Sequence, residues 1–370
     1  MRLHFDVGLC VRAKSKFSEC TKCVDVCPSS IQMVDNLPSF PVSTGVEAAA
    51  CVGICPTQAF KLSDFSTTEF FFRFLDSKVR LISPKVNVPC VSVLSVEHLI
   101  SLALASDETI SIDLRSYQEG SLLLGHIEAM IEEANFVLSS FCDKQLQTNL
   151  VKHEEEKQLS LEDTFEQETS RRDFFKNASL KGAIKHKMAF EDAVNADEMQ
   201  HFEIDSSVIS KIKDKHLPDK RKILFTTLKR AKVPEVFEVL PQEEVSFISQ
   251  KYVTEACTNC QICYRICPTG ALSSDHKFSL IHFDTMLCVK CHLCHDACEP
   301  DAIKLQNGFE IKEFFEPTQR TLATFNVKRC IECGNSFTYT GGEQICPRCR
   351  VEEEEAVFLH ANAKRMRGEE

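Results

Sequence analysis

The sequence predicts an α+β multidomain protein in which several small modules are built around cysteines. At 370 residues the chain is longer than one compact core of ordinary size accommodates, so two to four domains are expected. The 20 cysteines fall into groups at 10–55, 257–298 and 330–349, and only Cys90 and Cys142 lie between the first two groups. An apolar helical pattern in that interval adds a small α/β layer to the cysteine modules.

The composition is that of a globular protein in a reducing compartment. Hydrophobic residues make up 43% and charged residues 26% of the chain, which disfavours a disordered or membrane-embedded protein. The formal charge of -11 disfavours nucleic acid as a partner. The sequence starts MRLHFDVG without a basic and apolar signal segment, and no apolar run reaches the roughly 18 residues of a membrane span. We therefore expect a cytoplasmic protein without direct membrane insertion, whose reduced thiols hold metal.

Two cysteine runs near residues 257–298 share the spacing Cys-x2-Cys-x2-Cys-x3-Cys. A two-residue gap lets successive thiolates turn around one iron-sulfur cube, and the fourth cysteine of each run ligates the other cluster. This crossing predicts two [4Fe-4S] clusters. The first set is Cys257, Cys260, Cys263 and Cys298, and the second set is Cys288, Cys291, Cys294 and Cys267. Zinc is the alternative, but eight cysteines in this arrangement exceed what a four-ligand zinc site uses.

The sequences CTNCQICYRICPTGAL and CVKCHLCHDACEPDAI resemble the bacterial two-cluster ferredoxin family, and the resemblance covers residues 248–308. It implies a ferredoxin-like domain that transfers single electrons. Two departures are visible: Glu299 precedes Pro300, so the second proline comes one place late, and 20 residues separate Cys267 from Cys288. Neither departure removes a ligand, but both alter loops that can shield a cluster and thereby set its potential.

The N-terminal group, which we place in a degenerate ferredoxin-like domain at 1–65, repeats the pattern with losses. Phe17 stands where the first run needs a cysteine, and Gly45 and Ala48 stand where the second run needs two. By the crossed rule, one cluster can still form if Cys10 supplies the missing thiolate across a longer loop. That N-terminal set is Cys10, Cys20, Cys23 and Cys55, whereas Cys27 and Cys51 remain in a site that has lost half its ligands.

The status of this N-terminal domain has two interpretations. Similar multi-cluster bacterial ferredoxins carry a long gap after the first ligand, and this resemblance implies Cys10 as a ligand of a third cluster. The alternative is that the domain has lost its metal and serves packing or docking. The sequence leaves both open.

The stretch 325–352 resembles a small zinc ribbon. Its two knuckles are separated by 12 residues that include Gly341 and Gly342, and these glycines predict a hairpin between the knuckles. Four thiolates close a tetrahedral coordination sphere, which predicts a structural Zn, with rubredoxin-like iron as the alternative. The ligands are Cys330, Cys333, Cys346 and Cys349. The charged tail from Glu352 onward is expected to fray.

The region between the first two cysteine groups predicts a small α/β domain at 79–142. Apolar residues from Leu123 to Phe141 recur at three- and four-residue steps and thus share one helix face. The sequences VPCVSVLSVEHLISLALA and HIEAMIEEANFVL are similar to a domain of multi-cluster ferredoxin proteins in hydrogenase-type and formate-oxidising systems. Cys90 and Cys142 have no histidine or acidic partner that the sequence can assign, so we expect them to be buried small side chains rather than nucleophiles.

Residues 143–247 have weak helical periodicity and predict a helical connector, with partial disorder as the alternative. Within it, Ser170–Lys176 resembles a twin-arginine export signal. Its mid-chain position and the lack of a following apolar stretch favour a helix start with Ser170 as N-cap instead.

The sequence thus predicts a protein that relays single electrons through [4Fe-4S] clusters, as a carrier or as a subunit of a larger redox system. No dinucleotide fingerprint or phosphate loop occurs, so we expect no independent catalytic activity. The expected partner is a redox protein or enzyme complex. The alternative is an accessory or assembly factor for a complex redox enzyme, in which the clusters are structural or sense conditions.

Overall fold

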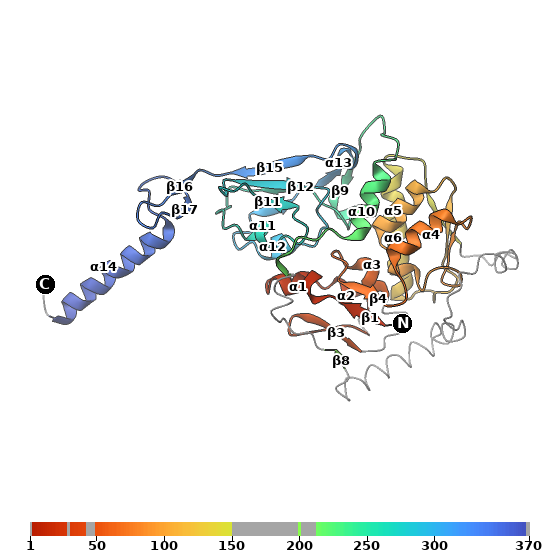
Figure 1. Ribbon diagram of the computed structural model, residues 1–370, viewed down its shortest axis with the longest axis horizontal. Coiled ribbons are helices and arrows are strands. Elements are labelled where there is room, and N and C mark those ends of the chain that lie inside the picture. The colour runs from red at the N-terminus through yellow and green to blue at the C-terminus, as the bar shows by residue number, and fades with distance from the viewer. Residues whose placement is uncertain (1, 28–29, 42–48, 150–198, 201–211, 368–370) are drawn as a thin grey trace.

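The computed structural model describes residues 2–27, 30–41, 49–149, 199–200 and 212–367. Its mixture of helices and several small sheets confirms the α+β class. Figure 1 shows three regions packed against one another and a C-terminal arm that extends away from them.

The described chain has four main parts. Residues 2–62 are the N-terminal module, 65–149 the middle layer, 248–324 the C-terminal module and 327–349 the ribbon. The first three make up the compact part of the molecule, and the ribbon begins the arm.

The N-terminal module combines short helices with two small antiparallel sheets. Its elements are β1 (Leu3–Phe5), η1 (Val7–Leu9), α1 (Val11–Lys14), α2 (Lys22–Val26), β2 (Gln32–Val34), β3 (Leu37–Pro41), α3 (Ala50–Ile54) and β4 (Phe60–Leu62), with β8 (Met199–Gln200) added from later in the chain. β1 pairs with β4, and β3 lies between β2 and β8. Phe5 and Phe60 are buried with ring centroids 4.8 Å apart, in the same hydrophobic cluster as Cys23 and Cys55, so aromatic packing contributes to the core of the module.

The middle layer contains a parallel sheet, β5-β6-β7, and three helices. Its elements are α4 (Thr67–Asp76), β5 (Leu81–Ile82), η3 (Val91–Val93), α5 (Val96–Ala105), β6 (Ile110–Asp113), α6 (Leu122–Ser139) and β7 (Leu146–Asn149). The helix expected from the apolar periodicity is α6, whose Ile127, Ala134 and Val137 are fully buried. β7 lies beyond residue 142, so the sheet includes a strand from the segment assigned to the connector.

Two details fix the middle layer locally. Ser95 caps α5 in a capping box with His98, so the helix begins at Val96 inside the core. Cys90 is 1% exposed, and its Sγ lies 2.9 Å from Ser92 Oγ and 3.4 Å from Tyr117 Oη. A buried thiol in this setting packs as a small side chain.

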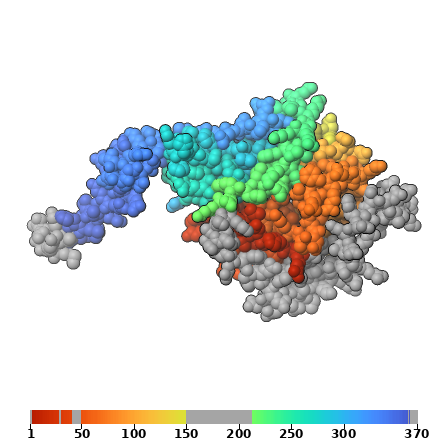
Figure 2. Space-filling model, in the orientation of Figure 1, coloured from red at the N-terminus to blue at the C-terminus, as the bar shows by residue number. Residues whose placement is uncertain are grey.

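The described part of the connector is structured by its neighbours rather than by its own periodicity. Its elements are α10 (Asp219–Leu228), β9 (Val239–Pro241) and η5 (Gln242–Glu244). α10 packs against α5, and β9 pairs with β14 (Gly308–Glu310) of the C-terminal module. Figure 2 shows this segment in green along the seam between the middle layer and the C-terminal module. The stretch Ser170–Lys176, with its predicted helix start, lies outside the described residues.

The C-terminal module repeats the strand-loop-helix plan of the N-terminal one. Its remaining elements are β10 (Lys251–Val253), α11 (Ile262–Ile266), β11 (Leu272–Ser273), β12 (Leu280–Asp284), α12 (Leu293–Asp296), β13 (Ile303–Leu305), α13 (Lys312–Phe315) and β15 (Gln319–Thr324). β10 pairs with β13 across the module, as β1 pairs with β4 in the N-terminal module. β12 lies between β11 and β15. The 20 residues between Cys267 and Cys288 thus supply two strands of this sheet, and β15 supplies the third.

The ribbon differs from the expectation in two places. Its hairpin, β16 (Val327–Arg329) with β17 (Ser336–Thr338), encloses the first knuckle, whereas Gly341 and Gly342 lie in the turn after β17. The tail is helical rather than frayed, because α14 (Pro347–Arg367) begins with proline at the favoured first position and continues through glutamates and alanines with high helix propensity. Asn259 Nδ2 donates to Thr338 Oγ1 at 3.0 Å and links the ribbon to the C-terminal module.

Within the described part of the chain, no helix has both the length and the apolar character that crossing a membrane requires.

Gly53 lies where α3 meets the loop around η3. A Cβ added there would be 2.1 Å from the Leu94 carbonyl oxygen and 2.4 Å from that of Ser92. Gly53→Ala should therefore lower the midpoint of thermal unfolding, with a destabilisation of about 1–3 kcal/mol typical of overpacking.

The matched control is Gly125→Ala in α6, where an added Cβ meets nothing within 4 Å. Replacing a helical glycine by alanine there should stabilise by up to about 1 kcal/mol. Equal midpoints for the two variants would contradict the close approach of α3 to the middle layer.

Candidate metal centres

The two runs of the C-terminal module share one backbone conformation. Asn259 and Gln261 in the first run have φ of 56° and 72°, and Lys290 and His292 at the same places of the second have 43° and 62°. A residue other than glycine in the left-handed region has a higher conformational energy. Alternation of left- and right-handed residues also turns successive N–H groups into a concavity that suits an anion. The same costly shape in both runs therefore indicates two equivalent ligand loops.

The first set of thiols is gathered at one end of the C-terminal module. The pKa of Cys263 is raised to about 12, mainly by burial and also by the charges of Cys294 and Cys260. Burial also raises the pKa of Cys257, with added contributions from Cys260 and Cys298. Cys298, the fourth member, therefore lies beside the thiols of the other run, as the crossed rule requires. Cys260 is exposed, so this set reaches the surface.

The second set lies deeper. Burial raises the pKa of Cys291, and the charges of Cys294, Cys267 and Cys288 raise it further. Three of the four thiols are buried and Cys291 is partly so. The structure thus brings Cys267 to the other run, and the two sets adjoin through Cys263 and Cys294.

The N-terminal set is also brought together. Burial raises the pKa of Cys10 to about 12, with smaller contributions from Cys55 and Cys20. The pKa of Cys23 is likewise raised by burial and then by Cys55, Cys10 and Cys20. Cys51 is fully buried, and Cys27 adds to the rise of its pKa. The four thiols of the N-terminal set therefore adjoin one another, and the leftover pair lies together at the position of a second site.

The two modules share a backbone turn after a cysteine, which we call the corner motif and which the cysteine spacing did not reveal. Three residues after Cys55, Cys267 and Cys298 come Gln58, Gly270 and Asp301, all with positive φ. At two of the three cysteines the next residue donates its N–H to the thiol, from Ala59 to Cys55 Sγ at 3.3 Å and from Ala302 to Cys298 Sγ at 3.2 Å. The alanine four residues after each of these cysteines was the readable signal. Cys55 thus has the backbone setting of a fourth ligand in the C-terminal module.

The donor sets fit iron-sulfur clusters. Each set offers four thiols, of which at least one is buried where the bare thiolate is disfavoured, so metal must displace its proton. Amide donors directed at the sulfurs, as at Cys55 and Cys298, favour the charged form of the ligand. Such hydrogen bonds are among the features that set a cluster's potential.

The ribbon has the geometry of a single-ion site. Its four Sγ atoms all lie within 4.8 Å of one another, and Cys333 and Cys346 are 3.7 Å apart. A tetrahedral ion with Zn–S bonds of about 2.3 Å places its sulfurs about 3.8 Å apart. The amides of Cys333 and Cys346 lower the pKa of Cys330 to about 6 against the effect of burial. Of the described residues, no other group of three or more cysteines, histidines or acids is gathered so closely.

Comparison with known proteins supports the cluster sites. Residues 251–273, which contain Cys257 to Cys267, match the 4Fe-4S binding domain family. No curated protein matches the chain, and no solved structure does. The match and the cysteine sets identify an iron-sulfur protein. The chain holds at least one [4Fe-4S] site.

Cys20→Ser should remove about four iron atoms per chain, because the N-terminal set then lacks a thiolate. Cys27→Ser, only seven residues away and outside that set, should leave the iron content unchanged. Iron and acid-labile sulfide analysis of anaerobically purified protein measures both. An equal iron content in the two variants would contradict the assignment of the N-terminal set.

Cys333→Ser should abolish zinc binding while the iron content stays constant, because a structural zinc site needs all four ligands. Cys333 is exposed, so the replacement disturbs little packing. Metal analysis by mass spectrometry of the variant, with Cys142→Ser as a control outside every set, tests this. Loss of iron instead of zinc would assign the ribbon to a rubredoxin-like site.

Proposed function

We propose that the chain relays single electrons through two [4Fe-4S] clusters in the C-terminal module and a third in the N-terminal module, with a structural Zn in the ribbon. The observation that carries this proposal is the arrangement of the thiol sets. The first set reaches the surface at Cys260, and the second adjoins it through Cys263 and Cys294 in the interior. When bound, a [4Fe-4S] cluster accepts or releases one electron. A surface set beside a buried one is the layout that a relay needs.

The surroundings of the thiols contribute exclusion of water and fixed hydrogen bonds. Ser249 Oγ lies 3.4 Å from Cys288 Sγ, and Thr269 Oγ1 lies 3.8 Å from Cys267 Sγ. These hydroxyls surround the second set, whereas the first set has the exposed Cys260. Exposure and hydrogen bonds to sulfur both change the reduction potential, so we propose that the two sets differ in potential.

The proposed partner is a redox protein or enzyme complex rather than nucleic acid, and the proposed setting is cytoplasmic. Because this chain has a formal charge of -11, a partner with a basic docking face would attract it. Complementary charge accelerates encounter, and salt weakens that attraction.

One observation favours an accessory or assembly factor as a second candidate. The ribbon and α14 extend from the rest of the molecule (Figure 1), and α14 exposes Val357, Phe358 and Leu359 by 65%, 65% and 66%. An arm with apolar side chains in solvent is suited to holding another protein. Stable binding to an immature client enzyme would favour this role, whereas rapid reversible reduction without a client favours the relay.

Anaerobically purified protein should contain about 12 iron, about 12 acid-labile sulfide and about one zinc per chain, given four iron per cluster. A reductive titration should then take up about three electrons reversibly. About eight iron with two electrons would assign the N-terminal module to packing. Clusters that are present but cannot be reduced reversibly would contradict the relay.

A further inference from the structure

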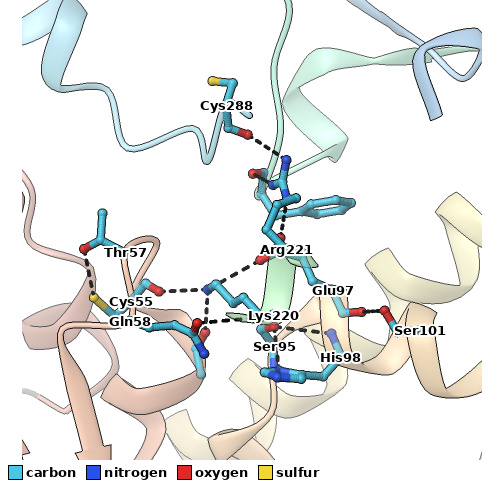
Figure 3. A network of polar contacts seen from close by, with 12 residues as sticks. Cys55, Thr57, Gln58, Ser95, Glu97, His98, Ser101, Lys220, Arg221 and Cys288 are labelled. Carbon is cyan, nitrogen blue, oxygen red and sulfur yellow. Dashed lines mark hydrogen bonds and ion pairs between the residues drawn. The ribbon is translucent and has the colours of Figure 1, made fainter. Parts of the chain in front are cut away.

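Three charged side chains are buried together where the N-terminal module, the middle layer and the C-terminal module meet (Figure 3). Arg221 is 0%, Glu97 1% and Lys220 3% exposed. Lys220 and Arg221 come from α10, and Glu97 comes from the first turn of α5. We call them the buried triad. None belongs to a cysteine run, and nothing in the relay described so far explains them.

Arg221 is directed at the C-terminal module. Its Nη1 donates to the carbonyl oxygens of Cys288 at 2.9 Å and Met286 at 2.7 Å, and its Nη2 donates to that of Phe247 at 2.8 Å. Its Nε donates to Glu97 Oε1 at 2.6 Å. The guanidinium therefore grips the main chain at the first cysteine of the second set.

Lys220 is directed the opposite way. Its Nζ donates to the carbonyl oxygen of Cys55 at 2.8 Å and to that of Gly53 at 3.2 Å. The same Nζ lies 3.5 Å from Glu97 Oε2. Cys55 is the corner cysteine of the N-terminal set, so the second cation holds a ligand of the other module.

Glu97 joins the two cations. A continuous series of polar contacts thus runs from Cys55 through Lys220, Glu97 and Arg221 to Cys288 (Figure 3). A buried ion pair is a weak source of stability, since apolar residues of similar volume often serve as well. Two adjacent residues of α10 nevertheless bind the backbone carbonyl oxygens of cysteines in both modules. Stability alone does not explain this arrangement.

The net charge of the buried triad supplies a reason for this arrangement. Two cations and one anion leave the buried triad with one net positive charge next to two sets of anionic thiolates. Positive charge and hydrogen bonding near a cluster favour its more negative, reduced form. The low dielectric of the interior leaves this effect poorly screened.

We propose that Glu97, Lys220 and Arg221 are positioning residues that hold the N-terminal set against the second set and raise the reduction potential of both. This inference rests on the proposed relay and on the third cluster. Lys220 acts on the N-terminal set through Cys55, and Arg221 acts on the second set through Cys288. The two modules then form one pathway.

The test uses two mirror-image double variants of the full-length protein. Glu97→Gln with Arg221→Met releases the C-terminal side, and Glu97→Gln with Lys220→Met releases the N-terminal side. Each removes one cation together with the anion, so the net charge of the triad is kept. The remaining cation loses its contact with Glu97 but keeps its hydrogen bonds to backbone carbonyl oxygens. The matched control is Lys222→Met, one residue further along α10, because the Lys222 side chain is 52% exposed and its ion-pair partner is the exposed Asp219.

The measurements are spectroelectrochemical potentials and electron paramagnetic resonance of the reduced protein. We expect the Arg221 variant to lower the potential of the second set and the Lys220 variant to lower that of the N-terminal set. Both should weaken the magnetic interaction between the sets at unchanged iron content, and Lys222→Met should change neither. This selectivity would not follow from a merely structural role, and if one variant fails to fold, the other still decides.

Unchanged potentials and an unchanged magnetic interaction in either folded variant would overturn the role of the buried triad while the relay stands. A wild-type protein whose clusters are not reversibly reduced would overturn both proposals. A wild-type protein without the third cluster would overturn the role of Lys220 and hence the joint pathway.

Discussion

Burial of cysteine thiols is the constraint on which the cysteine modules depend. In the N-terminal module the hydrophobic cluster around Phe5 and Phe60 includes four cysteines, and the cluster of the C-terminal module includes four more. The ribbon has little interior besides Cys330, Cys346, Cys349 and Ile345. Burial disfavours the thiolate form in such interiors unless metal neutralises its charge, so folding free energy and metal binding are coupled. The middle layer is different, because its core is built of aliphatic and aromatic side chains.

Features of the structure can be predicted from the sequence where the interacting residues lie close together along the chain. The ligand sets remain a prediction, which the sequence allows because Cys-x2-Cys spacing is local and the crossed rule joins the runs. The helix α6 could also be predicted, because its apolar period lies within one helix. The pairing of Glu97 with Arg221 joins residues 124 positions apart, through a helix that has no strong pattern of its own. Only the packed structure reveals such a contact.

The errors at the C-terminus have local physical causes. The sequence predicts a hairpin turn at Gly341 and Gly342, but the knuckle around Cys330 and Cys333 itself makes the turn, with Gly334 at φ 72°. Gly341 and Gly342 instead lead the chain toward α14. The charge of the tail predicts fraying. Opposite charges four residues apart nevertheless support a helix, and Arg348 pairs in this way with Glu352 at 2.8 Å. Charge alone therefore did not distinguish a solvated helix from a coil.

The seam at Gly53 has a consequence for how this sequence can diverge. The carbonyl oxygens of Ser92 and Leu94 occupy the space that any side chain at position 53 would need. The carbonyl of Gly53 is also held by Lys220, so a shift of α3 would be transmitted to the buried triad. Position 125, with open space around it, admits any residue that a helix tolerates. Position 125 of α6 can therefore accept substitutions, whereas position 53, between α3 and the middle layer, accommodates only glycine.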